Sequence, residues 1–395
     1  MLSCTDLYNI SAQLMHAFSD FVRAFGGQSV ILAGDFAQLP PVGPKPCLYS
    51  SKVNAGLLPE REDDQQAEMG KALWHQFTMV VILHRNMSQT GMCIEDQLFR
   101  HTLENMRYKA CTQDDFQLLD SCVVGQHVNS QSLLDDNFRY VSIITALNAH
   151  RDAINTYMCS QFAADHGQKL HYFHSIDTWP EKAWMSSSLR QSQRESARTV
   201  DPPHTSSSIL GTLQKTLWNL PPCSTSQQAG ILPLCVGMPV MLKSNEATEL
   251  CATNGAEATV VEWDSHVSTL DNEILDTLFI KLSDPPRTVQ VDELPPNVIP
   301  LTRSKIAICC SLPNDSTVRI DREQVRVLLN FAMSDYGSQG RTRPNNPCHL
   351  KHNRGHQSIY TVLSRSSSLH GTLILEGYDR SKLYGGASGA LRTEF

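Results

Sequence analysis

The stretch Gly34-Asp35-Phe36-Ala37-Gln38-Leu39-Pro40-Pro41-Val42 combines an acid, an amide and a diproline directly after a short apolar run. Residues 29–33 are apolar and β-branched, which predicts a buried strand. Asp35 would then lie at the carboxyl end of that strand, where open α/β sheets bind their ligands. Gln38 offers both a donor and an acceptor, and the two prolines hold the backbone after it extended. We therefore expect a functional site at this stretch.

Three more motifs follow along the chain. Residues 238–242 read MPVML and lead to an Asn-Gly-Ala turn at 254–256; residues 335–342 read DYGSQGRT, and residues 360–365 read YTVLSR. With the first stretch, they resemble the motifs of the Pif-type DNA helicases, which are relatives of RecD and of the helicases carried by Helitron transposons. The four matches come in the family's order and extend over most of the 395 residues. Their combination is more specific than any one motif.

The resemblance implies an α/β fold with tandem RecA-like P-loop NTPase domains, of which the first is incomplete and the second carries a small SH3-like all-β insert. It divides the chain as follows: a remnant of the first RecA-like domain at 1–92, the first part of the second at 93–230 with a linker rich in Ser, Thr and Pro at 186–228, the insert at 231–300, and the second part of the second domain at 301–395.

Hydrophobic periodicity and turn residues predict the individual elements. We expect a helix that begins with Thr5 as its N-cap and runs to Phe25, and a second helix at 94–107 with Leu98, Leu103 and Met106 facing inward. A third helix is expected from 146 to about 163. The expected strands are 29–33, 80–83, 140–145, 239–242, 259–263, 278–282, 289–291, 325–331 and 372–376.

In the resembled helicases, the glutamine of the first motif senses the terminal phosphate of ATP, which implies that role for Gln38. Arg365 would act as an arginine finger, because a guanidinium stabilises charge on a phosphoryl group during transfer. The alternatives are a turn residue for Gln38 and a simple ion pair with a carboxylate for Arg365. Asp35 would orient Gln38 or a metal-bound water, or else cap a turn. These three residues are the catalytic candidates.

The family's SQG motif links nucleotide and DNA, which implies nucleotide contacts for Gln339 and Gly340 together with Arg365. A glycine also lets a ligand approach the backbone closely, although a plain turn is the competing interpretation. In the resembled helicases, the segment that matches residues 145–155 lies beside the bound single strand, which implies phosphate contacts for Thr145 and Asn148. They lie at a predicted strand-to-helix junction, where backbone amides favour anions; a helix cap that serves only itself is the alternative. The DNA-contact candidates are Pro40, Pro41, Thr145, Asn148, Ser338 and Thr342.

Several motifs of a complete helicase are missing. The sequence contains no G-x-x-x-x-G-K-[ST] loop for ATP phosphates, and no acidic pair that would hold Mg²⁺. The family's second arginine finger lies in an Asn-Met-Arg triplet, which here reads Asn86-Met87-Ser88, and Arg85 is displaced from that position. We expect the chain to begin just after the metal-binding motif. ATP and Mg²⁺ would then be cofactors of a complete protein, no metal is assigned to this chain, and alone it would not hydrolyse ATP.

The composition and the net charge limit the classes of partner that we expect. No stretch is apolar enough to span a membrane and the N-terminus lacks the pattern of a signal peptide, so no membrane partner is expected. The 41% of hydrophobic residues is enough for two or three cores, and the twelve scattered cysteines, with no CxxC pair, indicate reduced thiols in a cytosolic or nuclear setting. A net charge of −7 argues against a broad basic surface but not against DNA in a cleft. The resemblance implies a monomeric helicase that uses ATP to move 5′ to 3′ on single-stranded DNA in genome maintenance or transposition, in the nucleus or in mitochondria. The alternatives are a non-catalytic remnant that binds single-stranded DNA and an interaction module built around the β insert.

Overall fold

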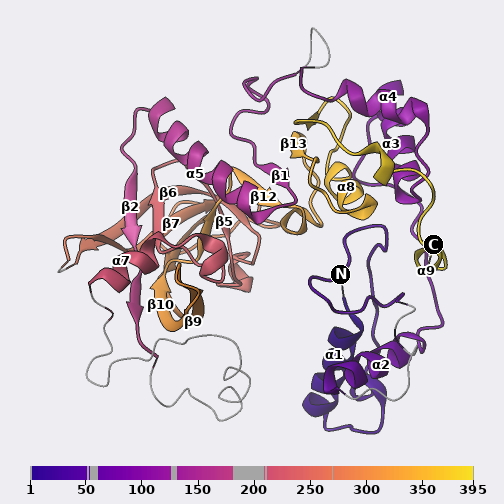
Figure 1. The fold of residues 1–395 in the computed structure, drawn as a ribbon, viewed down its shortest axis with the longest axis horizontal. Helices are drawn as coiled ribbons and strands as arrows, with labels where there is room; N and C mark the ends of the chain where they lie inside the picture. The colour runs from indigo at the N-terminus through magenta and orange to yellow at the C-terminus, as the bar shows by residue number, and fades with distance from the viewer. Residues whose placement is uncertain are drawn as a thin grey trace. The chain divides into compact units, whose positions relative to one another are not determined.

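The computed structural model divides the chain into two compact units (Figure 1). It describes residues 2–50, 53, 61–125, 131–180, 209, 211–268 and 270–394. The first unit contains residues 1–146 and 334–395, and the second contains residues 147–333. Each unit has its own hydrophobic core.

A parallel sheet forms the centre of the first unit. Strand β1 (Ile143–Thr145) pairs in parallel with β13 (Asn346–His349), which pairs in parallel with β14 (Thr372–Ile374). The fourth strand is β12 (Ala332–Ser334), where the chain returns from the second unit, and the order is β12-β1-β13-β14. The predicted α/β class with a parallel sheet is therefore confirmed, whereas the tandem RecA-like arrangement stays a prediction.

Two of the strands in this sheet are shorter than expected. The predicted strand 140–145 begins only at residue 143, because Tyr140 has a φ of 59°, a left-handed conformation that no strand tolerates. The predicted strand 372–376 ends at residue 374, and Glu376 has a φ of 50°. Both boundaries depend on single backbone conformations that hydrophobic periodicity does not report.

The predicted first helix was wrong at both of its ends. Helix α1 (Cys4–Phe18) is capped by Ser3 and not by Thr5, because the Ser3 hydroxyl accepts from the Asp6 amide while the Asp6 carboxylate accepts from the Ser3 amide. The helix ends at residue 18, where Ser19 takes the left-handed conformation with a φ of 53°. Helix α2 (Glu62–Trp74) packs beside α1, and both contribute to a small core with Leu7, Phe25 and Leu48.

The predicted strands 29–33 and 80–83 are also wrong. Both segments are irregular. The side chains of residues 80–83 are exposed, Leu83 by 88%, whereas in residues 29–33 Ile31 is 93% exposed but Val30 and Leu32 are half-buried against the small core of α1 and α2. A strand needs a neighbouring strand to satisfy its backbone amides and carbonyls. Within the described residues, neither segment has such a partner. Local β propensity alone was therefore insufficient to identify a strand.

Helix α3 (Ile94–Arg107) confirms the prediction for that range. Leu103 and Met106 are buried as expected, but Leu98 is 51% exposed, and Phe99 is the buried residue of that turn. The remaining helices of this unit are α4 (Gln113–Ser121), α8 (His356–Leu363) and the short α9 (Gly389–Arg392). Helix α3 contacts both α4 and α8, so it connects the helical layer to the helix that precedes Arg365.

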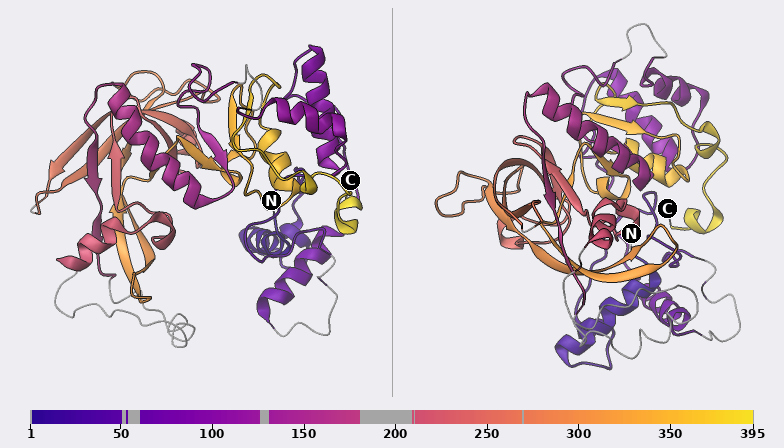
Figure 2. Two further views of the ribbon diagram at one scale, coloured as in Figure 1. Left: turned by 45° about the horizontal axis from the view of Figure 1, so that its top comes forward. Right: turned by 60° about the vertical axis from the view of Figure 1, so that its left-hand side comes forward.

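The second unit consists mainly of antiparallel strands, with helix α5 beside them (Figures 1 and 2). Its largest sheet has the order β11-β5-β6-β7-β8, and the smaller sheets have the orders β3-β10-β9 and β2-β4. The strands are β2 (His171–His174), β3 (Ile176–Thr178), β4 (Ile231–Leu234), β5 (Pro239–Leu242), β6 (Glu257–Val267), β7 (Glu273–Leu282), β8 (Val298–Thr302), β9 (Ser304–Ser311), β10 (Thr317–Gln324) and β11 (Val327–Leu329).

Most predictions for this unit hold. Helix α5 (Asn148–Asp165) is close to the predicted range, and the strand predicted at 239–242 is β5. Residues 259–263 and 278–282 lie within β6 and β7, but residues 289–291 form no strand, and only 327–329 of the predicted 325–331 is extended. Most of the predicted linker 186–228 lies outside the described residues, and its end contains helix α7 (Thr212–Asn219). The SH3-like assignment of this β region stays a prediction.

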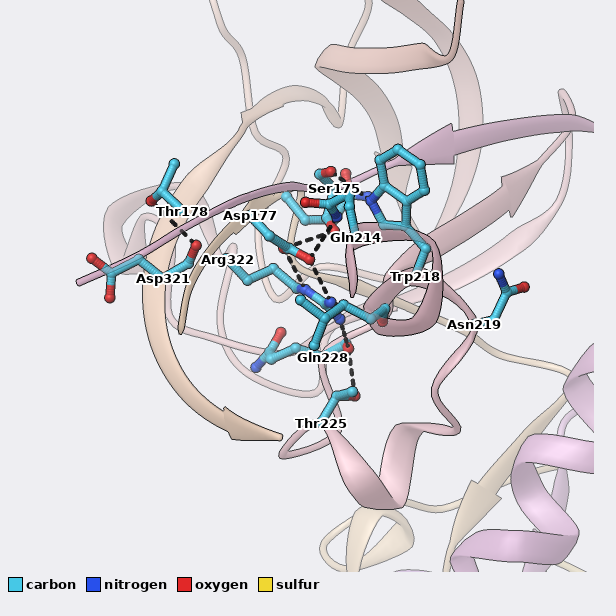
Figure 3. A network of polar contacts seen from close by, with 12 residues as sticks. Ser175, Asp177, Thr178, Gln214, Trp218, Asn219, Thr225, Gln228, Asp321 and Arg322 are labelled. Atoms are coloured by element: carbon cyan, nitrogen blue, oxygen red, sulfur yellow. Dashed lines mark hydrogen bonds and ion pairs between the residues drawn. The ribbon is translucent and has the colours of Figure 1, made fainter. Parts of the chain in front are cut away.

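A buried ion pair joins three elements of the second unit (Figure 3). The Arg322 Nε and Nη2 atoms each lie 2.8 Å from an oxygen of Asp177, and the two side chains are 1% and 0% exposed. Gln214 and Ser175 each donate to the same carboxylate at 3.0 Å, and Arg322 also donates to the Leu217 carbonyl. Every acceptor of the carboxylate is therefore used, so that loss of either charge leaves the other buried and unpaired.

We expect Asp177→Ala to lower the free energy of unfolding of the second unit by about 3–5 kcal/mol, because it leaves the Arg322 guanidinium uncompensated in the core. Urea denaturation measures the change. The matched control is Asp321→Ala, whose carboxylate pairs at 3.3 Å with the half-exposed Lys305 and should contribute less than about 1 kcal/mol. Equal effects of the two substitutions would contradict a special contribution of the buried pair.

The first residue of α8 makes the first unit sensitive to pH. Burial lowers the pKa of His356, with a smaller contribution from Lys109, and its Nε2 atom is buried without a partner among the described residues. The unfolded chain takes up a proton near the ordinary value of 6.5, whereas the folded imidazole stays neutral to a lower pH. Stability is therefore complete above that value and is lost as the pH falls through it.

The expected result is a fall in the urea midpoint of the first unit between about pH 7.5 and 5.5, and a smaller fall in His356→Gln, which cannot be protonated. His174 in the second unit also has a lowered pKa, so the difference between wild type and variant is the relevant measure. Parallel pH profiles for the two proteins would contradict a role for His356.

Candidate functional site

Asp35 builds the turn that contains Gln38. Its Oδ1 atom accepts from the Ala37 amide at 3.0 Å, and its carbonyl accepts from the Gln38 amide at 3.1 Å. Asp35 therefore caps a turn, which was one of the two roles expected for it. The Gln38 side chain is half-buried, and within the described residues its amide group makes no hydrogen bond. The turn thus presents an amide with unused donors and an unused acceptor.

Helix α8 holds this turn by three side chains. The Leu39 amide donates to Thr361 Oγ1 at 3.1 Å, and Gln357 Nε2 donates to the Phe36 carbonyl at 2.8 Å. The Tyr360 hydroxyl lies 3.4 Å from Asp35 Oδ2. These residues are more than 300 positions apart in sequence from the turn that they contact. The first and last of the sequence motifs are therefore brought together in one unit.

Arg365 follows the C-terminal end of α8 and is only 6% exposed. Its Nε donates to the Thr361 carbonyl at 2.9 Å, and its Nη2 donates to Ser364 Oγ at 2.8 Å. Among the described residues, no carboxylate lies at ion-pair distance from this guanidinium, and its Nη1 has no acceptor. Burial lowers the pKa of Arg365, but an arginine stays protonated in proteins. A positive charge is thus largely removed from water without a direct counter-ion, which favours a bound anion.

Arg107 is the residue that the sequence did not reveal. This last residue of α3 has its Nη2 atom 2.9 Å from Asp35 Oδ1 and its Nη1 atom 3.3 Å from Asp35 Oδ2. A basic residue in the last turn of a helix is common because it interacts favourably with the helix dipole. The sequence therefore contained no signal that separated Arg107 from an ordinary helix end.

The second expected nucleotide segment also contacts the first motif. The Tyr336 hydroxyl donates to the Pro40 carbonyl at 3.1 Å, and Asp335 accepts at 2.7 Å from Ser358 of α8. Gln339 follows this short turn, is half-buried and makes no side-chain hydrogen bond within the described residues. Gly340 is exposed with a φ of 79°, a conformation that suits glycine.

The residues that we expect to contact DNA differ in their exposure. Ser338 and Thr145 are each 0% exposed; the Ser338 hydroxyl donates to the Asp335 carbonyl, whereas Thr145 Oγ1 has no partner among the described residues. Thr342 is exposed and bonds to the Ser88 hydroxyl at 3.1 Å, and Asn148 is exposed at the start of α5. Pro40 is half-buried and Pro41 buried. The hydroxyls of Ser338 and Thr145 are therefore not presented at the surface, and the DNA role of the set stays a prediction.

A glutamine near the altered Asn-Met-Ser triplet fixes the chain around Arg365. Gln89 is 4% exposed, and its Nε2 donates to the carbonyls of Ser364 and Ser366 at 3.0 and 2.6 Å. No feature of the sequence distinguished Gln89. Arg85, by contrast, is exposed.

The chemistry of the site suits a phosphate better than a metal. Arg365 supplies charge, and Gln38 supplies an unused amide, which are the groups that bind phosphate oxygens. Both oxygens of Asp35 already accept hydrogen bonds from Arg107, so this carboxylate is not arranged as an Mg²⁺ ligand. The described residues around Arg365 therefore fit the phosphates of ATP but do not provide a magnesium site.

No helix in the described part of the chain combines the length and the apolar character required to cross a membrane. The sequence matches no protein-family model and no curated protein.

Solved structures of Pif1 helicases match the fold over nearly the whole chain. The Pif1 helicase from Candida albicans is 19% identical, covers 98% of this chain and 74% of its own, and has a TM-score of 0.57. The Bacteroides Pif1 helicase in complex with ADP-AlF3 and ssDNA is 17% identical, with coverages of 100% and 72% and a TM-score of 0.63. Bacteroides Pif1 bound to ssDNA is 16% identical, with the same coverages and a TM-score of 0.59. This chain therefore has the fold of the Pif1 helicases.

Proposed function

We propose that the chain is the motor segment of an ATP-dependent DNA helicase, which moves 5′ to 3′ on single-stranded DNA and in which Gln38 and Arg365 contact the terminal phosphate of ATP. The observation that carries the proposal is the Arg365 guanidinium, buried to 6% exposure without an ion-pair partner in the described residues. The fold supports it, because the solved Bacteroides relative is a complex with ADP-AlF3 and ssDNA.

Arg365 and Gln38 would have different roles at the terminal phosphate. Arg365 is pre-oriented by Thr361 and Ser364, so little reorganisation is needed when charge develops on a phosphoryl group. Gln38 presents its amide to the same phosphate or to an attacking water. Bound ATP would supply the phosphoryl group and the free energy of its transfer.

Movement of the DNA strand would be coupled through the diproline. The Leu39 amide is bonded to Thr361, and the Pro40 carbonyl accepts from Tyr336. A shift of the Gln38 turn is therefore transmitted to the helix before Arg365 and to the turn before Gln339. The half-buried Pro40 and the exposed Thr342 would contact the strand on this connected surface, and the buried Pro41 would hold the backbone beside Pro40 extended.

The sequence contains neither a phosphate loop nor an acidic metal-binding pair. We therefore propose that these 395 residues bind single-stranded DNA and triphosphate but do not turn over ATP by themselves. The second candidate function is a non-catalytic module that binds single-stranded DNA. It is favoured by Asp35, whose carboxylate is engaged by Arg107 and thus unavailable to a metal.

Substitution of Arg365 tests the binding of ATP and the binding of DNA separately. We expect Arg365→Ala to weaken binding of ATP by at least about tenfold, since it removes a charged hydrogen-bond donor, and to leave the affinity for oligo-dT within about twofold. Isothermal titration with ATP and fluorescence anisotropy with labelled oligo-dT measure the two affinities. Arg380→Ala, which changes the same charge at an exposed pair in the same unit, is the control.

Three outcomes would contradict the proposal. Rapid ATP hydrolysis by the wild-type chain would show that the missing motifs are not required. Undiminished ATP affinity in Arg365→Ala would remove the residue from the nucleotide site. Absence of oligo-dT binding would refute the DNA-binding part of both candidate functions.

A further inference from the structure

The ion pair beside Arg365 has a geometry that assigns it a function of its own. The two Nη atoms of Arg107 face the two oxygens of Asp35 at 2.9 and 3.3 Å, which is a bidentate arrangement. The Tyr360 hydroxyl adds a third donor to this carboxylate at 3.4 Å. Asp35 thus carries the negative charge at a point where three elements meet: the Gln38 turn, α3 and α8.

The charges at this point do not balance. Asp35 is the carboxylate that favours the charged form of Arg365, although it is not at ion-pair distance from it, and it is also the direct partner of Arg107. One carboxylate therefore serves two guanidinium groups. Among these three side chains the excess positive charge is one unit, which an added anion would neutralise.

The pair is also accessible. The Arg107 and Asp35 side chains are 36% and 18% exposed, whereas Arg365 is only 6% exposed. Asp35 belongs to the same turn as Gln38, whose amide has no partner in the described residues. We therefore expect an anion bound at Gln38 to compete with the Asp35 carboxylate for the Arg107 guanidinium.

Resting on the proposed function, we propose that Arg107 is a second residue that binds the terminal phosphate of a nucleoside triphosphate, and that Asp35 is its exchangeable counter-ion. In the free protein, Asp35 forms an ion pair with Arg107. A phosphate group with more than one negative charge displaces the single carboxylate, because a guanidinium pairs with a phosphate in the same bidentate manner. Asp35 therefore lowers the affinity for the nucleotide, and Arg107 raises it.

This arrangement predicts opposite effects of two substitutions at one ion pair. Asp35→Asn removes the competitor and should tighten binding of ATP and of inorganic tripolyphosphate by about five- to tenfold, which is the order of the interaction between two unit charges about 4 Å apart in a medium as polar as water. Asparagine can still accept from the Ala37 amide, so the turn is retained. Arg107→Gln should weaken the same binding by about tenfold. In the double variant, the gain from Asp35→Asn should disappear, since no guanidinium is left to release.

The measurement is isothermal titration of the full chain with both probes, and the unfolding midpoint of each variant verifies that it is folded. The exposed pair Arg380–Asp120 provides matched controls in the same unit, with side chains that are 48% and 21% exposed. Asp120→Asn and Arg380→Gln change the net charge equally, and both should leave the affinities unchanged. If the controls shift binding as much as the site variants, the effect is one of net charge and the inference is overturned.

The experiment distinguishes this inference from the proposed function. If Arg365→Gln weakens ATP binding while Arg107→Gln and Asp35→Asn do not alter it, Arg107 is structural and only the inference fails. If neither the wild type nor Asp35→Asn binds either probe, the nucleotide site of the proposed function fails as well. If Asp35→Asn tightens oligo-dT and not ATP, the pair regulates contact with the DNA backbone, and the assignment to a triphosphate is wrong.

Discussion

Thr361 forms hydrogen bonds with two distant segments, and the rest of the site depends on these bonds. Its hydroxyl accepts from the Leu39 amide, and its carbonyl accepts from Arg365 Nε. One residue of α8 thereby fixes both the turn that presents Gln38 and the guanidinium that follows the helix. Thr361 is itself 0% exposed, so neither hydrogen bond competes with bulk water. The two groups are held by a fold contact and do not require a ligand to bring them together.

The site was predictable where its chemistry lies within a motif and not where it lies between motifs. Residues 34–42 and 360–365 each contain their functional side chain, so the sequence was sufficient to select Gln38 and Arg365. The partner of Asp35 is Arg107, which is 72 positions away at the end of an ordinary amphipathic helix. Neither periodicity nor capping rules report such a contact. Gln89 was missed for the same reason, since its two acceptors are about 275 positions away.

The errors in the fold have a related cause. The helices at 94–107 and 148–165 were identified because their hydrogen bonds are local, and propensity and periodicity act on the same residues. The strands at 29–33 and 80–83 were predicted from the same kind of pattern, but a strand exists only with a neighbour. β5 has two such neighbours, β6 and β11, and it coincides with the predicted range. Sequence composition does not distinguish a strand that has a partner from one that has none within the described residues.

The charge distribution explains why the site can be stable without a ligand and still favour one. A guanidinium as deeply buried as that of Arg365 would be costly if it were entirely unpaired. Two neutral acceptors satisfy Nε and Nη2, and Asp35 supplies attraction from beyond ion-pair distance. Because that same carboxylate is shared with Arg107, the compensation is partial. With two of its three nitrogens hydrogen-bonded and its charge only partly compensated, the buried Arg365 guanidinium is tolerated without a ligand and gains most from a bound anion.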